Sequence, residues 1–233
     1  MNIAAVGFTC IDVYENLQRS YATGNGVDCL INLSQMGVAG SVVSAVGQDA
    51  YADLMRNTLA AYAIDHSHVH TLPGRTAVIK MSLNGLDRVH GERQRGVMEG
   101  YDLLPGDLEF IHQHDAIHTD LSWNVLPRLP AMRAKGARVF FDFSIKALDP
   151  RVKEILPHVE WGMFSFPEKN ADALDFLHWA AQIGGGVRIG TFGEAGAVAV
   201  AGSRVYEQPV VLQPRIVNTV GAGDAFAAGF LFG

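Results

Sequence analysis

The chain has 233 residues, of which 48% are hydrophobic and 18% are charged, a composition typical of a globular protein with a sizeable core. Its net charge of −6 and lack of a basic run argue against a nucleic-acid-binding surface, and no apolar run reaches the roughly 18 residues that a membrane span requires. No signal peptide precedes the first predicted strand, and Cys10 and Cys29 lie inside apolar segments. We therefore expect a cytoplasmic protein with buried thiols and no disulfide.

Short apolar runs alternate with amphipathic helical segments along most of the chain. In chain order we predict strand 3–8, helix 26–36, strand 41–46, helix 51–62, strand 116–119, helix 125–134, strands 139–143 and 161–164, helix 171–182, strand 187–191 and helix 225–231. This alternation predicts an α/β fold with a mostly parallel sheet and helices on both faces. Because ligands bind at the carboxyl ends of the strands in such sheets, we expect the site at that edge.

Two segments interrupt this alternation. Residues 12–17 are predicted as a second short strand soon after the first. Residues 76–83 and 86–91 alternate apolar and polar positions about Asn84-Gly85, which is a strong hairpin signal. Together they predict a small β-lid, formed by excursions near residues 11–18 and 75–98 from a single domain that spans residues 1–233. The lid is also where we expect a homodimer contact.

A short motif near the end of the chain combines a small-residue turn with an acid. In Asn218-Thr219-Val220-Gly221-Ala222-Gly223-Asp224, the amides of residues 222–224 and the positive end of the following helix can attract an anion. Asp224 can accept the proton of a hydroxyl that attacks a phosphate held there. The motif lacks the Gly-Lys-Ser/Thr of a Walker A loop, and Phe226 stands where a dinucleotide fingerprint has its third glycine. It indicates phosphoryl transfer, although a glycine-rich turn with a favourable first-turn acid is the structural alternative.

These residues resemble the second signature of the ribokinase-like (PfkB) carbohydrate kinases, Asp/Asn-Thr-x-Gly-Ala-Gly-Asp, whose final Asp is the catalytic base. Within that family the chain looks closest to the fructoselysine 6-kinases, through short collinear matches along its whole length. The stretches that carry the resemblance are Gly7-Phe8-Thr9-Cys10-Ile11-Asp12-Val13-Tyr14, Gly24-Asn25, Val46-Gly47-Gln48-Asp49, His66-Ser67-His68-Val69-His70, Asp87-Arg88-Val89, Gly96-Val97-Met98, Phe141-Asp142-Phe143-Ser144 and Thr191-Phe192-Gly193-Glu194-Ala195-Gly196.

The resemblance implies a ribokinase-like fold and an enzyme that uses ATP and Mg²⁺ to phosphorylate a primary hydroxyl of a sugar, here fructoselysine at its 6-hydroxyl. A kinase for fructose, ribose or a nucleoside and a non-catalytic sugar or nucleotide sensor are the alternatives. In the family, further residues follow the last helix and cover part of the adenine site, so we expect that a C-terminal part is missing from this chain.

The resemblance also implies roles for individual residues. Gly221, Ala222, Gly223 and Asp224 are the expected catalytic residues; Asp12, Gly24, Asn25 and Asp28 would bind the sugar; Thr191, Gly193, Gly196 and Thr219 would bind the nucleotide; and Glu168, which survives from an Asn-x-x-Glu element, is the candidate for placing Mg²⁺.

Besides the lost Asn of that element, the chain departs from the family pattern at three positions. Thr23 replaces a glycine and Asp28 replaces an asparagine beside the expected sugar site, and Asn218 replaces the Asp near which some members build a monovalent-cation site. On local pattern alone, Asp12 is also compatible with a solvated turn acid and Asn25 with a helix N-cap.

Three histidines, His66, His68 and His70, would share one face of an extended segment, and such spacing can bind Zn²⁺. Because no cysteine or carboxylate pattern accompanies them in the sequence, we expect no metal site there.

Overall fold

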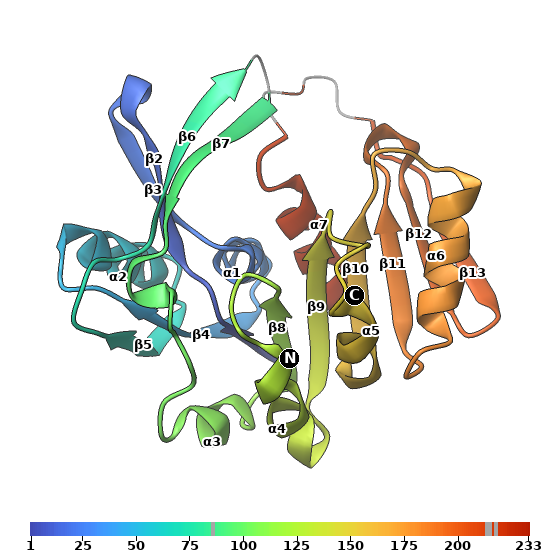
Figure 1. Ribbon diagram of the computed structural model, residues 1–233, viewed down its shortest axis with the longest axis horizontal. Coiled ribbons are helices and arrows are strands. Elements are labelled where there is room, and N and C mark those ends of the chain that lie inside the picture. The colour runs from blue at the N-terminus through green and yellow to red at the C-terminus, as the bar shows by residue number, and fades with distance from the viewer. Residues whose placement is uncertain (85–86, 213–215, 217–218) are drawn as a thin grey trace.

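The computed structural model describes residues 1–84, 87–212, 216 and 219–233. In this part of the chain, a nine-stranded sheet forms the body and a separate four-stranded sheet projects from one side of it (Figure 1). The strands of the large sheet are β1 (Asn2–Val6), β4 (Ala39–Val46), β5 (Asp65–Thr71), β8 (Ala116–Asp120), β9 (Arg138–Ser144), β10 (Trp161–Ser165), β11 (Val187–Thr191), β12 (Ala197–Ala201) and β13 (Arg204–Gln208).

The large sheet has the order β13-β12-β11-β10-β9-β8-β1-β4-β5. Pairing is parallel from β5 to β11, which confirms the mostly parallel sheet, but β12 and β13 form an antiparallel edge that the sequence did not predict. Strand β1 lies between β4 and β8. From β1 the chain adds β4 and β5 on one side and then β8 to β13 on the other, so the strand order reverses at β1. The carboxyl ends of the strands beside such a reversal are a usual place for a ligand.

Helices cover both faces of the large sheet. Neighbouring strand residues point to opposite faces, so Phe140 belongs to one buried core and Phe141 to the other. The first core contains side chains of α1 (Asn25–Gln35), α2 (Ala50–Ala61) and α7 (Ala222–Phe232), and the second contains side chains of α3 (Asp107–Ile111), α4 (Leu129–Arg133), α5 (Val152–Ile155) and α6 (Ala171–Ala181). Cys10 and Cys29 are both buried and unbonded to each other, as predicted.

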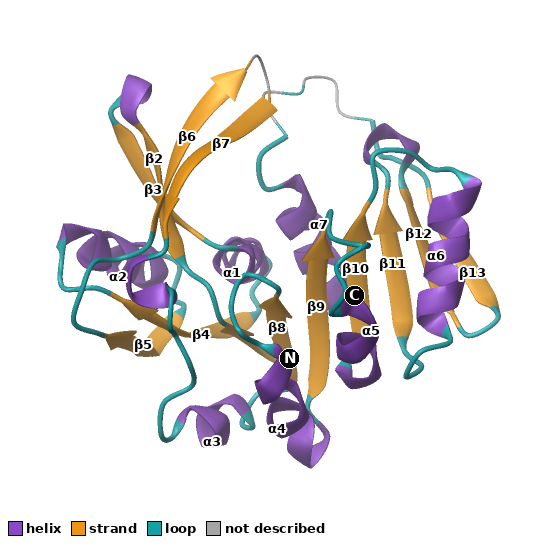
Figure 2. Ribbon diagram, in the orientation of Figure 1, coloured by secondary structure: helices purple, strands orange, loops and turns teal. Residues whose placement is uncertain are grey.

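The smaller sheet contains both predicted excursions. Figure 2 shows its strands rising away from the helices and strands of the body. The order is β3 (Arg19–Thr23), β2 (Cys10–Tyr14), β6 (Val78–Asn84) and β7 (Asp87–Gln94), and β6 and β7 pair antiparallel as the hairpin predicted. The Gly85 position of the predicted turn lies outside the described residues.

The first excursion differs in detail from the prediction of a strand over residues 12–17. Strand β2 ends at Tyr14, residues Glu15–Leu17 form a 3₁₀ turn, and Gln18, with a φ of 50°, reverses the chain into β3. The strand β3 itself was not predicted.

The predicted helix 125–134 is broken into shorter pieces. A 3₁₀ turn over Leu126–Arg128 precedes α4, and a second 3₁₀ turn over Ala134–Gly136 follows it. Pro127 and Pro130 explain the break, because proline lacks the N–H that a continuous helix needs.

One side chain joins the start of the small sheet to the body. Asp49 Oδ2 accepts a hydrogen bond from the Thr76 N–H (2.9 Å), and Asp49 Oδ1 accepts bonds from Thr76 Oγ1 (2.6 Å) and from the Ala52 N–H at the start of α2 (3.1 Å). The chain entering β6 is thereby held against the helix that follows β4.

Candidate active site

The turn that begins α7 carries the predicted catalytic motif. Gly221 is the N-cap with a φ of 76°, a conformation that favours glycine, and no side chain among the described residues caps the helix. The Ala222 N–H donates to the Thr219 carbonyl oxygen (3.2 Å), so it is used within the turn. A Cβ added to Gly221 or Gly223 would meet no atom within 4 Å. An anion could therefore approach the backbone and the positive end of α7 here.

A central cavity of about 470 Å³ opens beside this turn. It brings Asp224 together with Asn25 of α1, and the small sheet contributes His90 from β7. Its lining residues are Asn25, His90, Asp142, Ser144, Met163, Ser165, Thr219, Val220, Gly221, Ala222, Gly223 and Asp224.

Asn25 is not the N-cap of α1, because that position belongs to Gly24. Gly24 has a φ of 144°, and a Cβ there would lie 2.7 Å from the Phe8 carbonyl oxygen, so no larger residue fits. The Asn25 side chain instead reaches across to β9, where its Nδ2 donates to Asp142 Oδ2 (3.0 Å). This contact links the start of α1 to the carboxyl end of a central strand.

Asp142 is a buried carboxyl group in the central cavity. Burial raises its pKa to about 7, and the neighbouring Asp120 carboxyl adds to the increase. The Ser144 N–H, which donates to Asp142 Oδ1 (2.7 Å), and the amide of Asn25 oppose it. The side chain therefore exchanges a proton near neutral pH.

A second cavity, of about 700 Å³, lies between α1, α7 and the small sheet. Asp12 and Asp28 both line it, and it shares Val220, Gly221 and Ala222 with the central cavity. Of the described residues that line it, none is Lys or Arg. Thr23 Oγ1 donates to Asp28 Oδ2 at 2.5 Å, so the two departures from the family pattern contact each other. The charged side chains in its wall are thus two acids, Asp12 and Asp28, which suit a ligand that carries positive charge.

A third cavity, of about 430 Å³, lies on the other side of the α7 turn and shares Ser165, Ala222 and Gly223 with the central one. Gly193 and Gly196 line it: Gly193 begins a 3₁₀ turn after β11 and Gly196 directly follows that turn, as the predicted tight turn requires. Gly196 has a φ of 83°, and a Cβ there would lie 2.3 Å from the Gln208 carbonyl oxygen. The other lining residues are Ser165, Phe166, Thr191, Ala197, Gln208, Pro209, Val210, Val211, Ala222, Gly223 and Phe226.

The sequence matches known kinases. The profile described as pfkB family carbohydrate kinase matches residues 157–233. Over 234 residues the chain is 32% identical to a fructoselysine 6-kinase of Escherichia coli (strain K12), in an alignment that covers 99% of this chain and 88% of that protein. The chain belongs to the pfkB family of carbohydrate kinases. This kinase is also 29% identical to the fructosamine kinase FrlD of Bacillus subtilis (strain 168), over 99% of this chain and 82% of that protein.

The fold of the kinase is ribokinase-like. It matches the structure of Arabidopsis thaliana ribokinase complexed with ribose and ATP with a TM-score of 0.83 and 15% sequence identity, over 99% of this chain and 84% of that one. Among the described residues, no helix has both the length and the apolar character needed to cross a bilayer.

The structure places most, but not all, of the predicted site residues around the α7 turn of the kinase. Thr219 lines the central cavity and not the third one, where the predicted nucleotide ligands Thr191, Gly193 and Gly196 lie. Glu168 is exposed beyond the end of β10 and does not line any of the three cavities. Asn218 lies outside the described residues.

Two titratable residues that line the central cavity, Asp142 and His90, were not among the predicted site residues. Asp142 lies near the carboxyl end of the mostly apolar strand β9, and an acid in that place is the signal by which it could have been found. No sequence pattern marked His90 as a site residue, because it reaches the cavity only through the position of the small sheet relative to the α7 turn.

Proposed function

We propose that the kinase transfers the γ-phosphoryl group of ATP to the 6-hydroxyl of fructoselysine or of a closely similar fructosamine. The observation that carries this proposal is the similarity to a fructoselysine 6-kinase along nearly the whole chain. The arrangement around α7 supports it, because the cavity that contains Asp12 and Asp28 and the largely apolar third cavity both border the glycine turn, and Asp224 lines the central cavity between them.

In this proposal Asp224 is the general base. It accepts the proton of the sugar hydroxyl as that oxygen attacks the phosphorus atom. The Gly223 amide and the positive end of α7 stabilise the negative charge on the phosphoryl oxygens, while Gly221 and Ala222 shape the turn. Sugar and nucleotide would approach from opposite sides of the turn, as an in-line displacement requires.

The third cavity fits the nucleotide in this proposal. Apolar side chains such as Phe166, Val210 and Phe226 can cover an adenine ring, and the glycines at 193 and 196 let the backbone come close to phosphates. Mg²⁺, when bound, neutralises charge on the transferred group. The role of Glu168 in holding it stays a prediction, and we assign no monovalent cation.

The second cavity fits the sugar and its amine. Fructoselysine differs from fructose by a secondary amine, which carries positive charge at neutral pH, and by the amino acid attached to it. We propose that Asp12 orients the sugar hydroxyls and that Asp28, oriented by Thr23, faces the amine. A carboxylate attracts an ammonium group in a way that the usual asparagine of the family does not.

Coupled ADP release with a panel of fructoselysine, fructose, ribose and cytidine tests this proposal. We expect the highest kcat/KM for fructoselysine. An equal or higher kcat/KM for one of the other substrates would reject the fructosamine assignment but would still show a kinase. If none of the four substrates caused ADP release, the result would favour a non-catalytic sensor.

The role of Asp28 leads to a specificity prediction. Asp28→Asn should lower kcat/KM for fructoselysine by roughly tenfold, because a partly buried charge pair is lost, and should change that for fructose by less than about twofold. Thr23→Ser is the matched control, since it keeps the hydroxyl that donates to Asp28 and should keep the preference. A parallel loss for both sugars would show that residue 28 does not recognise the amine.

We also propose that the small sheet acts as a lid, since His90 of β7 lines the same cavity as Asp224. Saturating fructoselysine should slow hydrogen exchange across residues 76–98, because closure removes the strands from water. The helix α6, which lies apart from the lid, is the internal control. Unchanged exchange in 76–98 would reject the lid role. A homodimer through the lid stays a prediction.

A further inference from the structure

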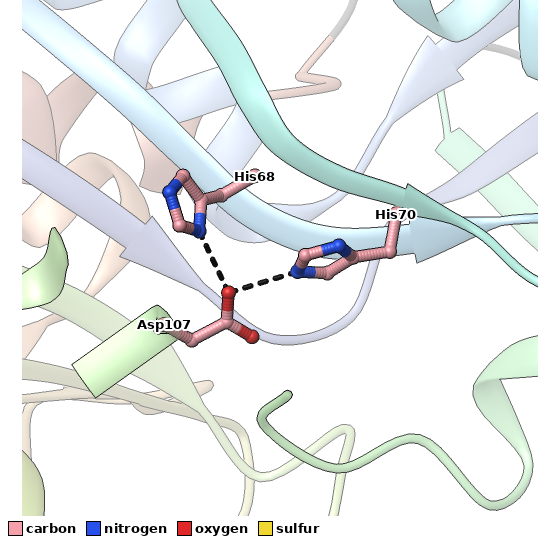
Figure 3. Close-up of side chains that lie close together, drawn as sticks. All are labelled: His68, His70 and Asp107. Carbon is pink, nitrogen blue, oxygen red and sulfur yellow. Dashed lines mark hydrogen bonds and ion pairs between the residues drawn. The ribbon is translucent and has the colours of Figure 1, made fainter. Parts of the chain in front are cut away.

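Apart from the active site, two histidines of β5 and one aspartate of α3 converge on a single point (Figure 3). His68 Nδ1 lies 2.7 Å and His70 Nε2 lies 2.8 Å from the same atom, Asp107 Oδ1. The histidines share one face of their strand because they are two residues apart. Asp107 lies 39 residues after His68 and 37 residues after His70, so no local pattern in the sequence joins the three. The structure thus supplies the carboxylate that sequence spacing could not reveal.

Surrounding contacts hold these three side chains in place. The Asp107 side chain is 0% exposed, and its Oδ2 accepts a hydrogen bond from the Leu104 N–H (2.7 Å), which leaves Oδ1 facing the two rings. Phe110 stacks on the His68 ring, with ring centroids 3.9 Å apart and planes 13° from parallel. The side chains of His68 and His70 are 24% and 23% exposed, so an ion can reach the cluster from solvent.

We propose that His68, His70 and Asp107 form a binding site for a divalent transition-metal ion, with Zn²⁺ as the best fit. Two imidazole nitrogens and a carboxylate oxygen are ligands that Zn²⁺ accepts, and a water molecule completes the four positions in sites with three protein ligands. Mg²⁺ prefers oxygen ligands alone, so this site is chemically separate from the magnesium of phosphoryl transfer. None of the three residues lines the cavities around α7.

Metal binding replaces two hydrogen bonds. Ligand atoms about 2.0–2.2 Å from a tetrahedral Zn²⁺ lie roughly 3.3 Å from one another, so each ring nitrogen must move about half an ångström away from Asp107 Oδ1. The ring proton at each ligating nitrogen moves to the other nitrogen, which leaves a lone pair for the metal. The three ligand atoms already lie within 4.8 Å of one another, so rotations of the partly exposed histidine rings can bring them to this spacing, while the Leu104 N–H keeps the carboxylate in place. The ion would tie the edge strand β5 to α3.

Equilibrium dialysis against Zn²⁺, followed by metal analysis, tests the site with His70→Gln and a matched control, His66→Gln. His66 lies on the same strand, but its Nδ1 contacts the Ile64 carbonyl oxygen (3.1 Å) instead of Asp107. We expect one equivalent of Zn²⁺ per chain in the wild type and in His66→Gln, and at least about tenfold weaker binding in His70→Gln. Zn²⁺ should raise the melting temperature by a few degrees in the first two proteins only.

Unchanged Zn²⁺ affinity in His70→Gln, or no retained Zn²⁺ in the wild type, would overturn the proposal and leave a hydrogen-bonded cluster. A second readout needs no variant. Co²⁺ bound by nitrogen and oxygen ligands in a four-coordinate site absorbs visible light much more strongly than aqueous Co²⁺. The wild-type protein should show this stronger absorption, and a spectrum equal to that of aqueous Co²⁺ would also overturn the site.

Discussion

Asp224→Asn should lower the turnover of this kinase by roughly 10²–10⁴-fold, the loss that is typical when a general base is removed. Asparagine keeps the size of the side chain but cannot accept the proton of the sugar hydroxyl. The affinity for sugar should change little, because the base acts mainly as the proton moves. The melting temperature should hold or rise slightly, since the substitution removes a negative charge from the wall of a cavity that the Asp142 carboxyl also lines.

Asp172→Asn is the matched control for this substitution. Asp172 is an exposed acid in the first turn of α6, and α6 and α7 both have 11 residues. The control therefore removes the same favourable interaction with a helix N-terminus while leaving turnover unchanged. Undiminished turnover in Asp224→Asn would remove Asp224 from the chemistry, and a collapse of its melting temperature would assign it a structural role.

Asp142→Asn should stabilise the unliganded kinase at pH 8, and the gain should vanish near pH 4. In the unfolded chain this carboxyl titrates near its ordinary pKa of about 3.9, whereas burial raises the pKa to about 7 in the folded protein. Between these values the folded state binds more protons, so the free energy of unfolding falls as the pH rises from about 4 to 7. The penalty is fully present above pH 7 and amounts to at most about 4 kcal/mol. Asparagine is neutral in both the folded and the unfolded state, so the variant does not have this penalty.

Thermal melts of wild type and variant between pH 4 and pH 8 measure this difference. The variant can keep its local contacts, because its carbonyl oxygen can accept the Ser144 N–H and the Asn25 amide can turn over to accept from it. Asp149→Asn is a control of opposite sign, since Arg151 lowers the pKa of Asp149 to about 2. That variant should be less stable than wild type at pH 7. A pH-independent difference for Asp142→Asn would show that the group does not carry the raised pKa.

The parts of the fold that the sequence predicted are those where local pattern and burial agree. Apolar runs predicted the central strands, such as β1 and β9, because parallel strands covered on both faces contain few polar residues. The edge strands β5 and β13 were not predicted, since their sequences, Asp-His-Ser-His-Val-His-Thr and Arg-Val-Tyr-Glu-Gln, are too polar to give that signal. The predicted helix 125–134 was longer than α4, because the helical periodicity of its apolar residues was followed although Pro127 and Pro130 interrupt a helix.

The candidate site shows the same division between local and long-range information. The turn at Gly221–Asp224 could be identified because its whole chemistry lies in consecutive residues. The Asn25–Asp142 hydrogen bond spans 117 residues, and the capping preference of asparagine pointed to a different role. Likewise, no local pattern could bring Asp107 to His68. Such contacts are set by strand order and by the packing of helices on the sheet.

Phosphorus NMR of a reaction that contains the kinase, fructoselysine, ATP and Mg²⁺ tests the central claim most directly. We expect ATP to disappear as ADP and one phosphomonoester form in equal amounts, with the phosphorus of the ester coupled to the protons on carbon 6 of the sugar. Unconsumed ATP, or release of inorganic phosphate without a phosphomonoester, would contradict the account. A phosphomonoester at another hydroxyl would contradict the proposed orientation of the sugar toward Asp224.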